Sequence, residues 1–235
     1  MNMWQVGCTH WIHDIRLRLT TRTLLVGALC CALAGPALAG GQKEEYLSQS
    51  VRAALQKAVA DVAVSRTAFS NKGEEEAWLQ QMSRRLARFV PDEQERIELL
   101  TTIHWEASRA GLDPQLVLGL IQVESGFHKY ATSVVGARGY MQVMPFWTRQ
   151  IGNREHNLFQ LRTNLRYGCL ILRHYINIEQ GDLFRALGRY NGSLGRAEYP
   201  NMVVGAWKRN WDYMPRTKTA TVSYTHLTLP TICSV

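Results

Sequence analysis

The feature that most constrains the fold is a helical repeat of apolar and small residues between positions 158 and 175. These residues recur at alternating steps of three and four: Leu158, Leu161, Leu165, Gly168, Leu172 and Tyr175. Such spacing places one face of an α-helix against a core. The chain shows no parallel-sheet pattern, internal repeat or phosphate-binding glycine loop. The sequence therefore predicts an all-α fold with at most a small loop or β element.

Six further helices are expected from the same periodicity, at 44–66, 74–89, 93–110, 114–124, 183–190 and 197–211. Asp92, Asp113 and Asp182 mark three of the helix starts, because an aspartate side chain can cap free backbone amides. Residues 133–144 break the helical period with Gly136 and Gly139. This segment is expected to form a loop or a short hairpin.

The first 39 residues have the arrangement of an export signal. Its parts are a basic stretch, an apolar run and a small-x-small cleavage site: Arg16, Arg18 and Arg22, then 24–33, then 37–39. The apolar run is too short to cross a bilayer. A buried helix is the alternative interpretation. The signal predicts a periplasmic mature protein that begins near Gly40 and has no integral membrane span.

Charge and cysteine content narrow the possible partners. The chain has 27 basic and 19 acidic residues, of which the first 39 positions hold 3 and 1, so the remainder carries a net charge of +6. An exported basic protein suits an anionic partner such as the cell wall or a membrane surface. Nucleic acid is the intracellular alternative, and the export signal argues against it. Cys169 and Cys233 follow the signal without metal-ligand spacing, so no metal or other cofactor is expected.

One glutamate lies on the apolar face of a predicted helix. Leu116, Leu120 and Glu124 are four residues apart, so Glu124 points the same way as core side chains. Burial raises the pKa of a carboxyl group, and an acid still protonated near neutral pH can donate a proton to a leaving oxygen. The alternative is a structural glutamate paired with a base such as Arg138. The position alone does not decide between them.

The other acidic residues in the sequence have no comparable setting. Glu106, Glu155 and Glu198 are interpreted as solvated or capping positions. A second catalytic acid among them remains an alternative.

Glu124 begins the first of five short motifs. In chain order they are ESGF from Glu124, SVVGARGYMQVMP from Ser133, NLRYG from Asn164, ALGRYNG from Ala186 and YPNMV from Tyr199. Together they resemble the motifs of the soluble lytic transglycosylase (SLT) domain, a relative of goose-type lysozyme. The resemblance covers about 92–211. Tyr140 stands where the family has leucine, and Gly192-Ser193 stands where it has Ala-Gly.

The resemblance implies a lysozyme-like helical domain that cleaves the β-1,4 bond between N-acetylmuramic acid and N-acetylglucosamine in peptidoglycan. Glu124 would protonate the glycosidic oxygen. Its carboxylate would then take the proton from the muramoyl C6 hydroxyl as that oxygen attacks C1, which gives a 1,6-anhydro product. One alternative is a lysozyme-like hydrolase, which needs a second acid to position water. Another is a wall-binding scaffold without turnover.

The resemblance also assigns expected roles to eight other residues, and core packing or turn geometry is the alternative for each. The roles are support of the acid's orientation for Ser125, a narrow groove floor for Gly136 and Gly139, lining of the site for Met141, a hydrogen bond to sugar for Gln142, facing the acid and substrate for Tyr190 and Asn191, and contact near the acid for Tyr199.

The chain is accordingly divided into four expected parts. They are an export signal at 1–39, an N-terminal helical extension at 40–91, the SLT-type domain at 92–220 and a non-native or disordered tail at 221–235. The tail is threonine-rich and apolar and resembles a translated cloning scar. Glycan strands of peptidoglycan are the expected partner, with cell-envelope machinery as a further possibility.

Overall fold

The computed structural model describes residues 41–61, 69 and 71–214, so the predicted export signal and tail lie outside the described residues. In chain order the elements are α2 (Gln49–Ala60), α3 (Lys72–Leu86), α4 (Glu93–Arg109), α5 (Pro114–Glu124), α6 (Phe146–Ile151), α7 (Leu161–Ile178), α8 (Leu183–Asn191), α9 (Glu198–Ala206) and the π-helical turn η2 (Trp207–Trp211). The all-α prediction is confirmed for this part of the chain. Its β features are two isolated bridges, Thr132 with Arg138 and Arg138 with Val143.

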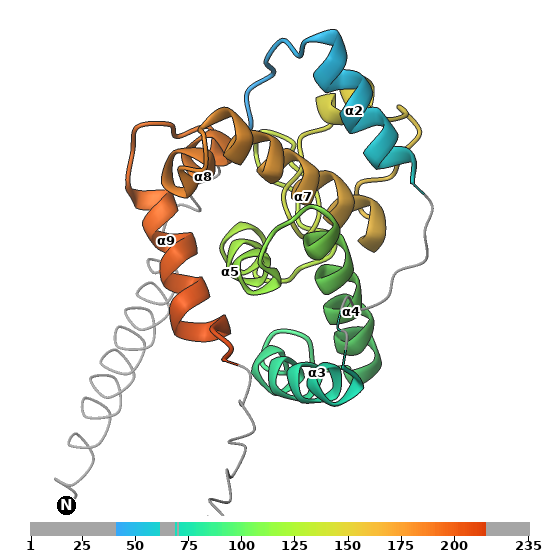
Figure 1. Ribbon diagram of the computed structural model, residues 1–235, viewed down its shortest axis with the longest axis vertical. Coiled ribbons are helices and arrows are strands. Elements are labelled where there is room, and N and C mark those ends of the chain that lie inside the picture. Colours follow the sequence, from blue (N-terminus) through green and yellow to red (C-terminus); the bar gives the residue numbers. More distant parts are fainter. Residues whose placement is uncertain (1–40, 62–68, 70, 215–235) are drawn as a thin grey trace, which may run out of the picture.

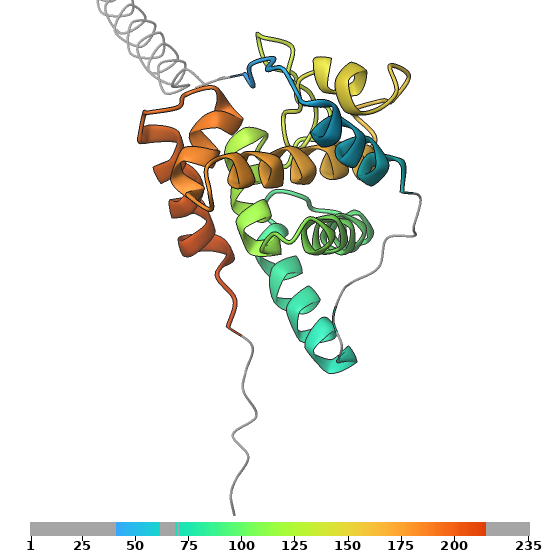
Figure 2. The same ribbon diagram turned by 45° about the horizontal axis from the view of Figure 1, so that its top comes forward.

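Helix α5 lies at the centre of the assembly, as Figure 1 shows. It contacts α4 on one side and α9 and η2 on the other, while α7 crosses α4 and leads into α8. Figure 2 shows α3 projecting from the body of the molecule beside α4, which it contacts. The sequence of α5 explains its position, since residues 116–121 are all apolar or glycine and all are buried. In the part of the chain that the structure describes, no helix is long and apolar enough to cross a membrane.

The contact between α5 and η2 is unusually close. A Cβ atom added to Gly119 would lie 2.8 Å from the Cβ of Trp207. Three residues further along α5, the Gln122 Oε1 atom accepts hydrogen bonds from Trp211 Nε1 at 2.8 Å and Asn210 Nδ2 at 3.0 Å. Glycine thus lets η2 approach the end of α5 that carries Glu124.

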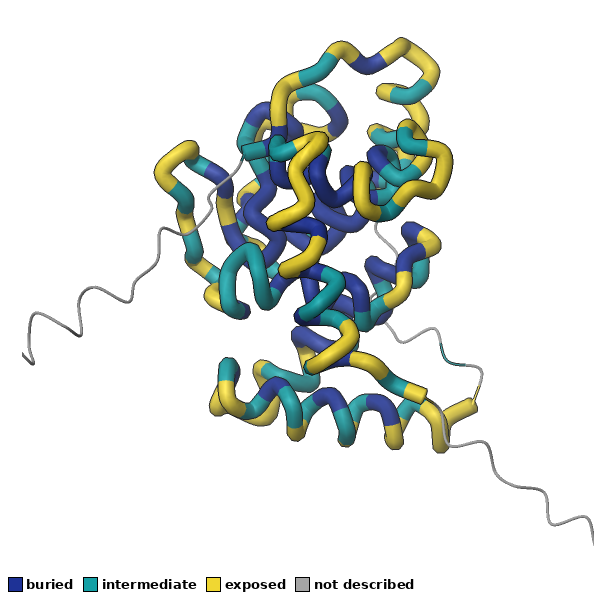
Figure 3. The backbone as a smooth tube through the Cα atoms, turned by 90° about the vertical axis from the view of Figure 1, so that its left-hand side faces the viewer, coloured by how far each residue is buried: buried dark blue, intermediate teal, exposed yellow. Residues whose placement is uncertain are grey.

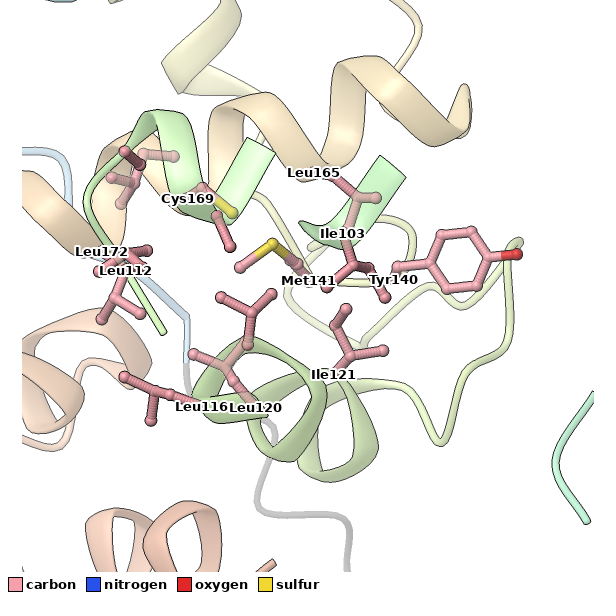
Figure 4. Close-up of a cluster of buried hydrophobic side chains, with 14 of the residues drawn as sticks. Ile103, Leu112, Leu116, Leu120, Ile121, Tyr140, Met141, Leu165, Cys169 and Leu172 are labelled. Atoms are coloured by element: carbon pink, nitrogen blue, oxygen red, sulfur yellow. The ribbon is translucent and has the colours of Figure 1, made fainter. Parts of the chain in front are cut away.

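The hydrophobic core joins α5, α7 and the glycine loop (133–144). The tube in Figure 3 shows buried segments concentrated in the middle of the molecule. In Figure 4, Met141 from the loop lies between Cys169 of α7 and the α5 side chains. A Cβ atom added to Gly168 would lie 2.7 Å from the Cβ of Met141, so α7 has glycine where the loop packs on it. Cys169 is fully buried, and burial raises the pKa of its thiol.

The prediction of a helix at 44–66 is wrong at its beginning. Residues 41–48 are not helical and form a segment that we call the strap. Gln42 and Leu47 of the strap are buried, at 5% and 4% exposure. Ser48 ends the strap by capping α2, where its hydroxyl accepts a hydrogen bond from Val51 N at 3.4 Å. Residues 62–66 of the predicted helix lie outside the described residues.

Other boundaries differ by a few residues. Helix α3 begins at Lys72, within the expected break, because Asn71 caps it through a 2.8 Å hydrogen bond from Gly73 N. Helix α7 begins at Leu161, and Leu158 packs in the core before it. The short helix α6 was not expected from the apolar spacing.

Glu106 corrects a second prediction, because it is neither solvated nor a cap. Its side chain is 2% exposed and forms ion pairs with Arg109, Arg162 and Arg166 at 3.0–3.4 Å. Arg166 Nη1 also donates to the carbonyl oxygens of Val59, at 3.1 Å, and Asp61. The cluster therefore joins α4 and α7 to the end of α2.

Candidate active site

Glu124 is the last residue of α5, and its carboxylate is paired with a tyrosine. The Tyr199 hydroxyl of α9 donates a 2.5 Å hydrogen bond to Glu124 Oε1. The alternative of a glutamate paired with Arg138 does not match this arrangement, since the Arg138 guanidinium lies over the Phe159 ring at 5.9 Å. Among the described residues, no ion pair involves Glu124. Glu124 thus lacks the charged partner that would hold it ionised.

Burial dominates the electrostatics of this acid. It raises the pKa of Glu124 to about 8, against the opposing effect of the Tyr199 hydrogen bond. No carboxylate in the described part of the chain contributes to that shift. The pKa of Tyr199 lies well above its usual range because of burial and the nearby Glu124, so its hydroxyl remains a donor. At neutral pH the Glu124 carboxyl can therefore hold a proton on Oε2 and transfer it.

The ESGF motif ends α5 and fixes the direction of the following chain. Ser125 Oγ donates to Tyr140 O at 2.7 Å and is 3.2 Å from Ile121 O. Gly126 and Phe127 have left-handed φ values of 56° and 67°. The Phe127 ring is buried and contacts the ring of Trp211 at a centroid distance of 5.3 Å. The hydrogen bond from Ser125 to Tyr140 O thus links the end of α5, next to Glu124, to the glycine loop.

Glycine occupies positions 136 and 139 of the glycine loop for different structural reasons. Both have left-handed φ values, 85° and 74°. A Cβ atom added to Gly139 would lie 2.5 Å from Asn164 Nδ2, whereas one added to Gly136 would have no atom within 4 Å. Gly139 therefore permits a close approach to α7, and Gly136 permits a turn in an open position.

Asn164 organises this loop from inside α7. Its amide nitrogen donates to Arg138 O at 2.8 Å and Leu158 O at 2.7 Å, and its Oδ1 accepts from Met141 N at 2.8 Å. Sequence reasoning placed Asn164 in a motif but gave it no role. A buried asparagine in an apolar helical repeat was the available signal, because such a side chain needs internal partners.

Gln142 is buried and bound to its own loop. Its φ is 48°, and its amide nitrogen donates to Ala131 O at 3.1 Å and Gly139 O at 3.0 Å. These contacts correspond to the turn-geometry alternative. The hydrogen bond from Gln142 to sugar stays a prediction.

Tyr190 connects α8 to the loop beside the acid. Its hydroxyl donates a 2.8 Å hydrogen bond to Met141 O, and its side chain is fully buried. Burial and the nearby charge of Glu124 raise the pKa of Tyr190. Asn191 ends α8 and is 4% exposed. Tyr190, Met141, Tyr199 and Glu124 are thus gathered from α8, the loop, α9 and α5.

Within the described residues, no group of three or more histidine, cysteine, aspartate and glutamate side chains is arranged to hold a metal ion. The site's chemistry instead centres on a protonated carboxyl group. A group of this kind can donate a proton and then, once ionised, accept one.

Comparison with known proteins gives a family match over the region that holds Glu124. Residues 101–206 match the family described as "Transglycosylase SLT domain". A protein named "Transglycosylase" from Enterobacteria phage PRD1 is 35% identical over 98 residues, which are 42% of this chain and 36% of that protein.

Two proteins named "Membrane-bound lytic murein transglycosylase C" match shorter stretches. The protein from Actinobacillus pleuropneumoniae serotype 5b (strain L20) is 44% identical over 48 residues, and that from Haemophilus influenzae (strain PittEE) is 48% identical over 46 residues. Each stretch is 20% of this chain and 13% of the relative. The chain thus spans about a third of the phage relative and about an eighth of the other two.

Proposed function

Residues 101–206 belong to the transglycosylase SLT domain family, and on this premise we propose that the protein is a peptidoglycan lytic transglycosylase. The bond cleaved is the β-1,4 bond between N-acetylmuramic acid and N-acetylglucosamine. The observation that carries the proposal is the half-buried Glu124, whose pKa of about 8 suits a proton donor.

Glu124 acts twice in the proposed mechanism. Its protonated carboxyl first gives a proton to the glycosidic oxygen as the bond from that oxygen to the muramoyl C1 breaks. The resulting carboxylate takes the proton of the muramoyl C6 hydroxyl, whose oxygen forms a bond to C1. The products are a 1,6-anhydromuramoyl end and a free N-acetylglucosamine hydroxyl, and Glu124 is protonated again.

Tyr199 positions the acid in this mechanism. Its hydroxyl holds Oε1, which leaves Oε2 for the reacting oxygens, and it stabilises the carboxylate that forms after the first proton transfer. The hydrogen bonds of Ser125 to Tyr140 O and of Tyr190 to Met141 O hold the glycine loop beside Glu124. Met141, Gly136, Gly139, Gln142 and Asn191 complete the proposed substrate site.

Hydrolysis of the same bond is the alternative reaction. A hydrolase uses a second carboxylate roughly 5–10 Å from the first, either to activate water or to act as a nucleophile. Such a neighbour would raise the pKa of Glu124. Burial is the main cause of the raised pKa of Glu124, as it is for the acid of a lysozyme-type hydrolase, so the reaction product distinguishes the two reactions.

We propose that the enzyme acts in the periplasm, to which the predicted export signal at 1–39 would direct it. The basic balance of the remaining chain suits a wall that carries anionic peptide stems. Its partner is the glycan strand of peptidoglycan, and the cell-envelope machinery that would require local opening of the wall is a further proposed partner.

Mass spectrometry of sacculi digested with the full chain tests the proposal. Muropeptides that end in 1,6-anhydromuramic acid are the expected products. Reducing muramic acid ends would show hydrolysis. Binding to sacculi without any soluble muropeptide would show a scaffold without turnover.

A further inference from the structure

The strap (41–48) is attached to the glycine loop through a single buried carboxamide. Gln42 Nε2 donates to Gln142 O at 3.2 Å, and Gln42 Oε1 accepts from Met144 N at 3.0 Å. Both amide atoms of Gln42 are therefore paired with backbone groups two residues apart in the loop.

These two backbone groups form one outer edge of the loop. Between them, Val143 N and O both pair with Arg138, at 3.0 Å. In each trans peptide group the N–H and C=O bonds point to opposite sides. Gln142 O and Met144 N consequently face away from Arg138, and Gln42 is the group that meets them.

The chemistry of this edge fits an amide ligand. One carbonyl acceptor and one N–H donor that face the same way match a primary carboxamide, whose C=O and syn N–H bond also point the same way. The 2-acetamido group of an N-acetylated sugar is a trans secondary amide. Its C=O can accept from Met144 N–H, or its N–H can donate to Gln142 O, and Gln42 occupies both positions. The strap side chain and an N-acetylated glycan would therefore compete for the same edge.

The strap also reaches the end of α8. Glu45 forms an ion pair with Arg189, with 3.0 Å between Oε1 and Nη1. A Cβ atom added to Gly192 would overlap the carbonyl oxygen of Gly41. Gly192 is one of the two departures from the family motif, which has alanine at this position. Glycine here gives the strap room to pass between the turn after Tyr190 and the glycine loop.

We propose that the strap is an internal inhibitor, in which Gln42 occupies the amide-binding edge of Gln142 and Met144 and must leave before an N-acetylated glycan binds. The inference rests on the proposed function for its ligand. It adds a regulatory contact: the strap joins the loop that holds Met141 to the helix end that holds Tyr190, which are the two segments beside Glu124.

Binding of tri-N-acetylchitotriose to the full chain tests the inference by calorimetry. Gln42→Ala removes both hydrogen bonds of the strap, so we expect the trisaccharide to bind roughly tenfold more tightly than to wild type. Lys43→Ala changes an exposed strap residue and is the matched control, with wild-type affinity expected. The de-N-acetylated trimer should gain nothing from Gln42→Ala.

Amide hydrogen exchange supplies a second measurement, independent of the variants. Adding tri-N-acetylchitotriose to wild type should speed exchange at strap amides while Met144 N–H stays protected. Equal affinities of wild type and Gln42→Ala, with unchanged strap exchange, would overturn the inference.

Muropeptide release by the same chains separates this inference from the proposed function. Release by wild type with equal affinities for all variants would leave the function standing and remove the inhibitor. Tighter binding by Gln42→Ala without muropeptide release from any chain would support the inhibitor and contradict the proposed function.

Discussion

The Tyr199 hydroxyl donates its hydrogen bond to Glu124 Oε1 across 75 positions of the chain. This bond favours the ionised carboxylate and so lowers the pKa of Glu124, in opposition to burial. The relationship sets the pH range in which the proposed acid can work, because a proton donor loses activity as the pH rises through its pKa of about 8.

Tyr199→Phe should move the alkaline limb of the pH–rate profile upward. The variant loses the hydrogen bond that stabilises the carboxylate, so the pKa of Glu124 rises and the limb should shift by about one pH unit. Rates of muropeptide release measured from neutral to alkaline pH check this. Tyr213→Phe, at a half-buried tyrosine outside this hydrogen bond, should leave the limb in place. An unmoved or lowered limb in Tyr199→Phe would contradict the assignment.

Glu124→Gln should abolish muropeptide release while the protein still binds sacculi. Glutamine keeps the shape of the side chain but cannot supply the acid proton, so release should fall at least roughly a hundredfold. The matched control is Glu93→Gln, at an exposed glutamate in the first turn of α4. Undiminished release by Glu124→Gln would refute the mechanism.

The raised pKa of Glu124 also links folding to pH. In the unfolded chain the carboxyl loses its proton near 4.5, whereas in the folded chain it keeps the proton to about 8. Between these values the native state binds more protons, so this group's contribution to the free energy of unfolding decreases as the pH rises.

Glu124→Gln removes this dependence. The stability of the variant relative to wild type should therefore increase between pH 4.5 and pH 8, by something on the order of a few kcal/mol. Urea denaturation of both chains at acidic and alkaline pH measures the change. A constant difference between the two would mean that the carboxyl is not buried in its neutral form.

Glu106→Gln should destabilise the fold. It leaves Arg109, Arg162 and Arg166 without their shared buried carboxylate, and loss of one member of a buried ion pair costs about 3–5 kcal/mol. Equilibrium denaturation checks the value, and the exposed Glu93→Gln should change stability by less than about 0.5 kcal/mol. A wild-type midpoint for Glu106→Gln would show that the cluster does not support the fold.

Gly168→Ala should disturb the loop that carries the site. The new Cβ would lie 2.7 Å from the Cβ of Met141, so α7 and the loop must separate, at a cost of about 1–3 kcal/mol. Thermal unfolding and muropeptide release should both decline. Gly205→Ala is the control, because its Cβ would meet only the movable guanidinium of Arg209. Equal behaviour of the two variants would argue against a tight α7–loop contact.

Local signals were sufficient for much of the fold. Helices α5 and α8 could be predicted because Asp113 and Asp182 cap them and apolar spacing defines their buried faces. The burial and ion pairs of Glu106 could not be predicted, because two of its partners, Arg162 and Arg166, lie 56 and 60 positions away. The strap was mistaken for helix because Leu47 continues the spacing of α2. Its conformation instead depends on Gln142, which is 100 positions away.

Part of the candidate site could likewise be predicted from the sequence, and part could not. The position of Glu124 on the apolar face of α5 indicated its burial, and the Tyr199 motif could be found by its resemblance to the family. The contacts of Gln142 depend on a left-handed φ and on loop carbonyls that the spacing does not reveal. The apolar repeat indicates that Asn164 needs internal partners, but the partners themselves could not be predicted, because all three are backbone atoms outside its helix.

The hydrogen bond from Trp211 to Gln122 can form only after both residues have been synthesised. Gln122 is two residues before the acid, and its partner is made 89 residues later. Because a ribosome delivers the chain from the N-terminus, Glu124 emerges well before the tyrosine that orients it and the turn that braces its helix. A nascent chain therefore contains Glu124 before the residues that surround it in the fold, and the candidate site can assemble only when synthesis has passed Trp211.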